Sequence, residues 1–363
     1  MTTIQKNNHI KSLDGVRGLA VILVFLNHWN LQRFTGGWIG VDIFFFLSGY
    51  LITSLIQLEY QKTGDISFKN FYIRRVLRLY PALILCVIIA NILWSYNEPF
   101  IGGQGNRMIA TISSIFYFNN LVVGTVNGNL GHLWSLSVEE HFYFLWPLLM
   151  YLFFLKMSLK KIFFSLSFII LLVWIWRIYV YNCNPTPIVF YGDKFVINAY
   201  LFTFCRIDSI LLGALISFIY IKNKGNLFVF NNRINHIVFG ILLLLLIIIT
   251  LTIDNEGALM KHGFFILTNM VCFSLIIFAL NNPDYILLSN RFIRWFGSRS
   301  YGIYLYHFPV FTLIYKLKVI DHYPLNFFWV TTLRLGISLV LAEISFRLLE
   351  TPILRLKEKY NSH

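Results

Sequence analysis

The sequence predicts an all-α, polytopic membrane protein with about ten transmembrane helices and both termini in the cytoplasm. Of its 363 residues, 57% are hydrophobic and only 13% are charged, and the mean hydropathy is +0.67. A soluble domain carries about 25% charged residues. The net charge of +14 could serve nucleic-acid binding, but basic residues also collect in the cytoplasmic loops of membrane proteins. Because no soluble basic domain is available to hold a duplex, we expect no nucleic-acid partner.

The apolar runs place the helices in order along the chain. They cover residues 15–32, 38–58, 77–96, 133–155, 162–181, 196–221, 235–253, 262–280, 300–317 and 325–349. A further run at 108–125 is interrupted by Asn119, Asn120 and Gly124. Without that run, nineteen loop lysines and arginines fall on one side of the membrane and six on the other, as the positive-inside rule requires. We therefore expect ten spans, with 97–132 as an external segment that either stays outside or dips back into the protein.

The domain organisation that follows is simple. Residues 10–355 form one integral-membrane domain, and 1–9 and 356–363 are short cytoplasmic tails. The first helix begins with polar residues and lacks a small-residue cleavage site, so we expect a retained anchor in the cell inner or plasma membrane. The four cysteines are scattered and form neither a disulfide framework nor a metal knuckle, so no metal is expected.

Three polar residues mark the first helix, which is otherwise apolar. At 100° per residue, Asp14, Arg17 and His28 all lie on one stripe of the helix. An ionisable group near the bilayer centre costs at least about 2.5 kcal/mol on insertion scales. Ion pairing that locks helices together would explain Asp14 with Arg17, but it does not explain His28. The stripe therefore predicts an internal polar chamber, with a hydrogen-bonded core histidine as the alternative.

Seven segments of the chain together carry a family resemblance. The first four are LDGVRGLAVILVFLNH (13–28), GGWIGVDIFFFLSGYLIT (36–53), FYIRRVLRLYPAL (71–83) and HLWSLSVEEHFYFLWP (132–147). The others are RIDSILLGALI (206–216), FGSRSYGIYLYHFPV (296–310) and the Glu-Thr-Pro at 350–352. In this order the segments resemble the integral-membrane acyltransferase-3 family, the O-acetylases of surface polysaccharides.

The resemblance implies a membrane acyltransferase that moves an acyl group, in the first instance acetyl, from acyl-CoA to a hydroxyl of a cell-envelope or exported sugar. Acetyl-CoA would be a donor substrate and no cofactor would be bound permanently. Some relatives append an extracytoplasmic esterase-type domain, whereas this chain ends eight residues after Arg355. The expectation is that the membrane domain acts alone.

Acyl transfer needs an anion site for the coenzyme and a base near the thioester. Arg75 and Arg78 share one helical face on the cytoplasmic side, where guanidinium groups suit phosphates; ordinary positive-inside charge is the alternative. Arg17 lies at the cytoplasmic mouth of the first helix and His28 about 16 Å deeper. Arg17 is therefore expected to hold the polar end of the coenzyme arm, with His28 as the base.

Two carboxylates are candidates for assisting the base. Asp42 begins the second helix at a depth similar to that of His28 and could fix the imidazole tautomer; a helix N-terminal acid favoured by the dipole is the alternative. Glu139 shares a helix face with Ser135, and the neighbouring Glu140 does not, so Glu139 is the predicted site member. Ser135 could equally be a helix cap.

Further chamber candidates come from later helices. Tyr304 and His307 recur at three-residue spacing, and Pro309 is expected to interrupt their helix just beyond. Arg206 and Asp14 are also chamber candidates, because each is an ionisable residue in or at the end of an apolar helix. The competing hypothesis is a polytopic transporter or flippase for a glycan or its precursor, a class that often shows paired repeats with broken helices in both halves.

Overall fold

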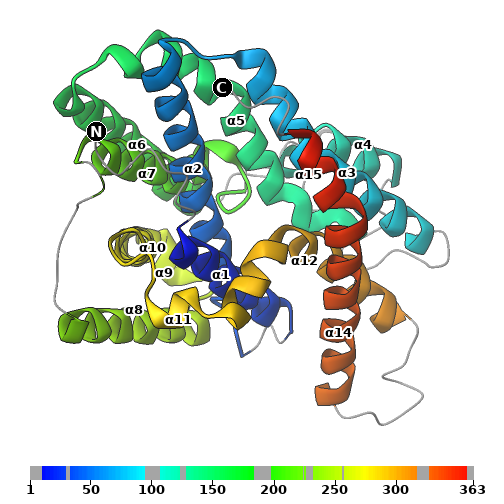
Figure 1. Ribbon diagram of the computed structural model, residues 1–363. Helices are drawn as coiled ribbons and strands as arrows, with labels where there is room; N and C mark the ends of the chain where they lie inside the picture. Colours follow the sequence, from blue (N-terminus) through cyan, green and yellow to red (C-terminus); the bar gives the residue numbers. More distant parts are fainter. Residues whose placement is uncertain are drawn as a thin grey trace. The chain divides into compact units, whose positions relative to one another are not determined.

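The computed structural model describes residues 10–29, 33–94, 107–122, 128–183, 198–223, 225, 232–255, 257–316 and 327–357. All regular structure in these ranges is helical, which confirms the predicted all-α class (Figure 1). The predicted tail at 1–9, most of the tail at 356–363 and residues 97–106 of the predicted external segment lie outside the described residues.

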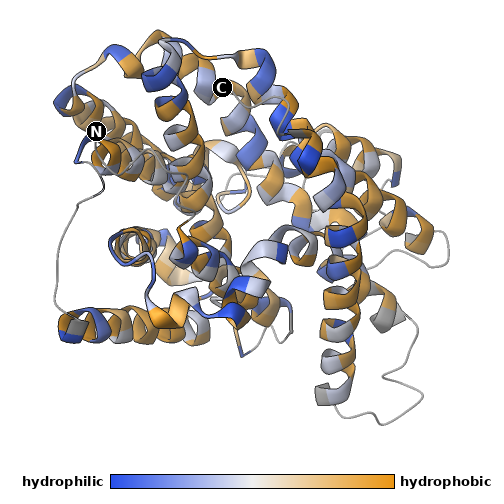
Figure 2. Cartoon of the chain, in the orientation of Figure 1, coloured by the Kyte–Doolittle hydropathy of each residue, from blue (hydrophilic) through white to orange (hydrophobic). Residues whose placement is uncertain are grey.

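Several helices have the length and composition of membrane spans. The five that qualify in the described part of the chain are α2 (Ile39–Thr63), α3 (Phe68–Trp94), α6 (Leu159–Cys183), α7 (Thr203–Lys222) and α8 (Asn232–Thr252). Figure 2 shows apolar residues along most of the helices. On α6 and α8, large apolar side chains such as Phe168 and Leu244 are more than half exposed. Exposed apolar surface on this scale belongs in lipid, so the chain is a polytopic integral membrane protein.

The chain divides into two compact units, which are described separately. Unit 1 comprises Met1–Ile66, Phe142–Asn184 and Phe202–Ser298, and unit 2 comprises Ser67–His141, Pro185–Leu201 and Arg299–His363. The division falls inside α5 (Trp134–Leu152) and inside α12 (Arg291–Lys316).

Unit 1 is built around α2. This helix packs on α1 (Lys11–Trp29), on α7 and on α10 (Phe265–Asn281), and α1 also contacts the short α11 (Ile286–Ser289). Glycines bring α2 and α7 into close contact: a Cβ on Gly49 would lie 1.8 Å from the Ile210 carbonyl oxygen, and one on Gly213 would lie 2.1 Å from the Phe46 carbonyl oxygen. Small residues at such crossings let membrane helices approach closely. The short α9 (Ala258–Lys261) contacts α6.

Unit 2 contains α3, α4 (Arg107–Ile115), the first part of α5, the later part of α12, and the last helices of the chain. Those last helices are α14 (Phe327–Ser345), a π-helical turn η5 (Phe346–Glu350) and α15 (Thr351–Lys357). Helix α12 lies against α3, since the Tyr301 hydroxyl donates to the Leu79 carbonyl at 2.7 Å.

Residues 107–122 and 128–133, called the hairpin below, pack on one another and on α3; residues 123–127 lie outside the described residues. The N-terminal end of α4 meets Asn91 through Arg107 Nε at 2.8 Å, and its C-terminal end receives a hydrogen bond from the Tyr80 hydroxyl to the Ile115 carbonyl at 3.3 Å. Helix α4 therefore runs antiparallel to α3. The 3-10 helix η2 (Asn119–Leu121) follows α4, and the 3-10 helix η3 (Gly128–Leu133) precedes α5.

Polar side chains stabilise the return of this hairpin. The Asn119 side-chain amide donates to the Ser114 hydroxyl at 2.9 Å and to the Leu130 carbonyl at 3.3 Å, and its backbone amide donates to the Ser137 hydroxyl at 3.1 Å. Irregular backbone is tolerated at membrane depth only where protein or a water-filled cavity surrounds it. In the described part of 108–125 the one α-helix, α4, is nine residues long, which is too short to cross a bilayer.

The predicted interruption at Pro309 is wrong. Helix α12 continues through Pro309 to Lys316. Proline lacks the N–H that would bond the carbonyl four residues earlier, which here is that of Leu305. This carbonyl instead accepts hydrogen bonds from His132 Nε2 at 3.0 Å and from the Cys86 thiol at 3.2 Å. The freed backbone group is thus satisfied from outside the helix.

Candidate active site

The stripe predicted on the first helix lies on α1 in unit 1. The helix spans Lys11–Trp29, so Asp14, Arg17 and His28 share one face as expected. Asp14 lies 3.8 Å from an Arg17 guanidinium nitrogen and 3.8 Å from Arg294 Nε of α12. Arg294 was not predicted as a site member. Two cations therefore flank one carboxylate at this end of the stripe.

His28 lies in the last turn of α1 and is partly buried. Its Nδ1 is 2.9 Å from the Val24 carbonyl oxygen, one turn earlier in the same helix. A carbonyl can only accept a hydrogen bond, so Nδ1 carries a proton. In the neutral imidazole, Nε2 is then the unprotonated nitrogen that can accept a proton.

Asp42, predicted to fix the imidazole tautomer of His28, has Arg206 as its ion-pair partner. Its carboxylate forms an ion pair with Arg206 of α7, and both side chains are at most 1% exposed. A buried guanidinium requires a counter-charge, and Asp42 supplies it. The tautomer of His28, which Asp42 was predicted to fix, is instead set by the Val24 carbonyl. Arg206, predicted as a chamber residue, is part of the same helix-packing pair.

A second buried pair extends this network in unit 1. Arg177 of α6 lies 3.6 Å from Asp208 of α7, and neither side chain is more than 1% exposed. Asp208 also accepts hydrogen bonds from Trp174 Nε1 at 2.9 Å and from the Asn269 side-chain amide at 2.7 Å. These contacts join α6, α7 and α10, which is a packing role.

In unit 2 the structure brings Ser135 and Tyr304 together with two histidines. The Tyr304 hydroxyl donates to the His132 carbonyl at 2.6 Å, so the 2.6 Å contact with Ser135 must have the Ser135 hydroxyl as donor. The His307 ring lies 5.3 Å from the His132 ring, and its Nδ1 is 2.6 Å from the Tyr304 carbonyl oxygen. Two of these residues, Tyr304 and His307, were predicted as neighbours on one helix.

His132 is a functional candidate that the sequence analysis missed. It is buried at the end of η3, and its ring stacks on Phe308 at 5.1 Å while its Nε2 donates to Leu305. The signal that could have found it is Pro309, because a proline inside a membrane helix frees a carbonyl that a nearby donor must satisfy.

Both glutamates at the start of α5 face this part of unit 2. Glu139 lies within electrostatic range of Tyr304, and Glu140 lies within range of Arg75 and Tyr80. One carboxylate oxygen of Glu140, Oε1, is buried without a hydrogen-bond partner. The predicted choice of Glu139 alone therefore leaves out a carboxylate that lies beside the coenzyme candidate Arg75.

Arg75 and Arg78 both lie on α3 and are partly buried. Arg75 is electrostatically coupled to Glu140, and Arg78 to Glu350 of the π-helical turn. Glu350 accepts a hydrogen bond from the Ser345 hydroxyl at 3.0 Å, and Ser345 contacts the Tyr306 hydroxyl at 2.8 Å. Each of the two guanidinium groups thus has a carboxylate within electrostatic range, and Ser345 holds that of Glu350 in place.

Comparison with known proteins places these motifs in a family. Residues 10–343 match the sequence model of the acyltransferase-3 family, described as an acyltransferase domain. The peptidoglycan O-acetyltransferase OatA of Listeria monocytogenes is 32% identical over 97% of this chain and 57% of that protein. A putative O-acetyltransferase of Staphylococcus aureus is 32% identical over 97% of this chain and 58% of its own length.

A third relative is the putative peptidoglycan O-acetyltransferase YrhL of Bacillus subtilis, which is 30% identical over 96% of this chain and 55% of that protein. The chain thus spans a little more than half the length of these curated relatives. No solved structure matches it. The family model covers most of the chain, and the chain therefore belongs to the acyltransferase-3 family of integral-membrane acyltransferases.

Proposed function

We propose that this chain is an O-acetyltransferase that moves an acetyl group from cytoplasmic acetyl-CoA to a hydroxyl of a cell-envelope polysaccharide, with peptidoglycan as the acceptor. Family membership supports the reaction class. Two relatives carry peptidoglycan in their names, which supports the acceptor.

The proposed topology has ten spans in the plasma membrane, formed by α1, α2, α3, α5, α6, α7, α8, α10, α12 and α14. Both termini are then cytoplasmic. The distribution of lysine and arginine supports this arrangement. The hairpin of α4, η2 and η3 enters from the external side beside α3 and adds no span.

The observation that carries the proposal is the state of His28. With Nδ1 donating to the Val24 carbonyl, Nε2 of the neutral ring is unprotonated, which is the state a general base needs. In the proposed reaction Nε2 takes the proton of the acceptor hydroxyl, and the oxygen attacks the thioester carbonyl. The tetrahedral intermediate collapses with cleavage of the carbon–sulfur bond, and the imidazolium returns its proton to the departing thiolate. A relay through an acylated residue is the alternative route.

The remaining residues divide by task. Arg75 and Arg78 are proposed to bind coenzyme phosphates, since guanidinium groups bind phosphate through paired hydrogen bonds, and Arg17 is proposed to hold the polar end of the coenzyme arm. Asp14 and Arg294 set the charge around Arg17. Ser135, Glu139, Tyr304 and His307 are proposed to line the chamber.

The test uses the purified full chain in lipid nanodiscs with radiolabelled acetyl-CoA and soluble peptidoglycan fragments. Alkali-labile label on the glycan is the expected result. A transporter or flippase would produce no acetylated glycan under these conditions, so the absence of transfer to a verified acceptor would contradict the proposal.

A further inference from the structure

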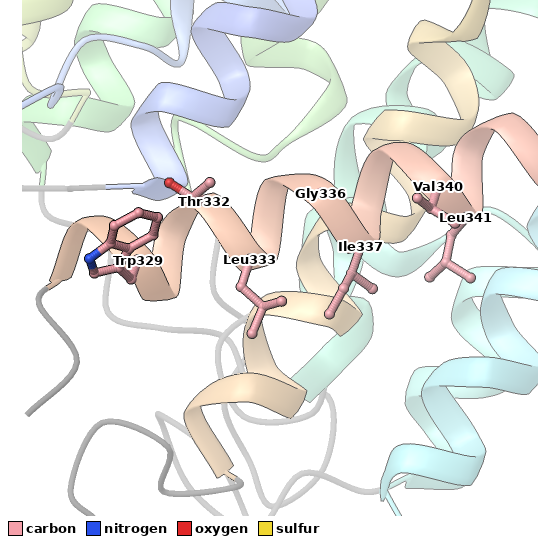
Figure 3. Close-up of a pocket in the computed structure, with 7 residues that line it drawn as sticks. All are labelled: Trp329, Thr332, Leu333, Gly336, Ile337, Val340 and Leu341. Atoms are coloured by element: carbon pink, nitrogen blue, oxygen red, sulfur yellow. The ribbon is translucent and has the colours of Figure 1, made fainter. Parts of the chain in front are cut away.

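Helix α14 presents two different faces. On one side, Leu333, Ile337 and Leu341 project together and line an apolar groove with Trp329 (Figure 3). The adjoining side of the helix carries a buried polar stripe, which consists of Thr331, Arg334, Ser338 and Ser345, each at most 8% exposed.

Arg334 is the charged member of this stripe. Its guanidinium carbon lies 5.3 Å from the centre of the Phe311 ring of α12, and its Nε is buried without a hydrogen-bond partner. No carboxylate pairs with it in the part of the chain that the structure describes. By contrast, the buried Arg206 and Arg177 each have an aspartate.

An unpaired cation within a membrane helix is costly, and such residues mark ligand or ion pathways. A purely structural role at this position would be served as well by an apolar side chain of similar size. The retained charge therefore points to an anion that arrives with a substrate.

The position of Arg334 separates it from the residues assigned to the coenzyme. It precedes Glu350, the partner of Arg78, by sixteen residues, which is about 24 Å of helix. Phe311, which contacts the guanidinium, also lies 5.8 Å from the His307 ring. Arg334 is thus on the side of unit 2 that holds the Ser135, Tyr304 and His307 cluster, away from Arg78.

We propose that Arg334 binds an oxyanionic group, a carboxylate or a phosphate, carried by the acceptor, so that the enzyme selects acidic glycans. The inference rests on the proposed function and names the acceptor class for that site. The planar guanidinium suits such a group because it donates two parallel hydrogen bonds to its oxygens.

The test compares three acceptors with the purified full chain in nanodiscs: a peptidoglycan disaccharide with free carboxyls, the same disaccharide with its carboxyls amidated, and the amidated disaccharide bearing a 1-phosphate. Arg334→Gln should raise KM for the charged acceptors roughly 10- to 100-fold and leave KM for acetyl-CoA and turnover of the amidated acceptor unchanged. Which charged acceptor the wild type prefers identifies the oxyanion.

Arg334→Lys should recover part of the preference, because it keeps the charge but loses the planar geometry. Arg347→Gln is the matched control, since Arg347 lies in the π-helical turn η5 after α14, is 71% exposed and pairs with Glu343. This variant should keep the preference for charged acceptors. An equal loss of transfer to all three acceptors, or a wild type without preference, would overturn the proposal.

Direct binding of the three disaccharides, measured without acetyl-CoA, separates this inference from the proposed reaction. Tighter binding of a charged disaccharide by wild type but not by Arg334→Gln supports the site even if no acetyl transfer is observed. Equal binding of all three by wild type refutes it even if transfer is robust.

Discussion

Replacing Asp42 with asparagine should destabilise the protein far more than it slows the reaction. The Asp42–Arg206 pair joins α2 and α7, and both side chains are at most 1% exposed. Removing one partner of a buried ion pair costs about 3–5 kcal/mol, because the remaining charge stays buried without its carboxylate. The Trp38 and Phe45 rings, 5.9 and 5.5 Å from the Arg206 guanidinium, contribute only about 0.5–2 kcal/mol each.

The assay is thermal unfolding in one detergent at a fixed scan rate, with acetyl transfer measured well below the transition. A loss of this size should lower Tm on the order of 10 °C, while kcat per folded molecule changes less than threefold. The control is Asp284→Asn, which breaks the ion pair with Lys11. This pair lies at the surface, with the Asp284 side chain 71% exposed and the Lys11 side chain 50% exposed. It should cost at most about 1 kcal/mol.

A double variant sharpens the result. Asp42→Asn combined with Arg206→Gln removes both charges and should recover part of the stability lost by the single change. If Asp42→Asn instead leaves Tm unchanged and lowers kcat more than 100-fold, Asp42 is a catalytic residue and the packing role is wrong.

Three further results are expected. In a Cys183→Ser background, an impermeant thiol reagent applied to intact cells should label Met108→Cys, which is exposed at the start of α4. It should not label Ser114→Cys, which is buried. If neither variant is labelled, the hairpin does not enter from the external side. Arg75→Ala with Arg78→Ala should raise KM for acetyl-CoA at least tenfold, and a rise in KM for the acceptor alone would contradict phosphate binding. Gly213→Ala should lower the stability of the protein by about 1–3 kcal/mol or more, because the added Cβ meets the Phe46 carbonyl. Gly240→Ala is the control: its added Cβ has no neighbouring atom within 4 Å, so the change should be neutral or stabilising.

The helical architecture follows from local pattern. Apolar runs long enough to cross a bilayer have no other stable solution than helices, so α2, α6 and α8 fall close to their predicted ranges. Helix α3 begins nine residues before its predicted start and α7 seven residues after, because hydropathy fixes helix ends poorly. Helical spacing likewise predicted that Asp14 and Arg17 would meet, three residues apart, and they lie 3.8 Å apart.

Contacts between distant segments were beyond this reasoning. Asp42 and Arg206 are separated by 164 positions, and no local spacing distinguishes that partner from His28, which is much closer in sequence. The hairpin of α4 was left open for a related reason. Its polar residues are incompatible with a span, and only the structure shows that Asn119 bonds Ser114 and the Leu130 carbonyl within the hairpin.

Pro309 shows how a correct local rule led to a wrong conclusion. The rule that proline removes a helical hydrogen bond holds here, but the consequence is a bond from His132 to the freed Leu305 carbonyl and not a broken helix. The donor lies 173 positions away.

The central claim is that His28 is the base, with the bond from Nδ1 to the Val24 carbonyl leaving Nε2 as the unprotonated nitrogen of the neutral ring. Its most direct test is single-turnover acetyl transfer by purified His28→Ala in nanodiscs, at saturating acetyl-CoA and a verified acceptor, with acetyl-CoA binding measured on the same sample. Alanine keeps the helix, and the loss of a positioned base lowers the rate about 10²–10⁴-fold. We expect the acetyl-transfer rate to fall by this factor while acetyl-CoA binding stays unchanged. Transfer at close to the wild-type rate would contradict the role of His28 as the base and make His307 the next candidate.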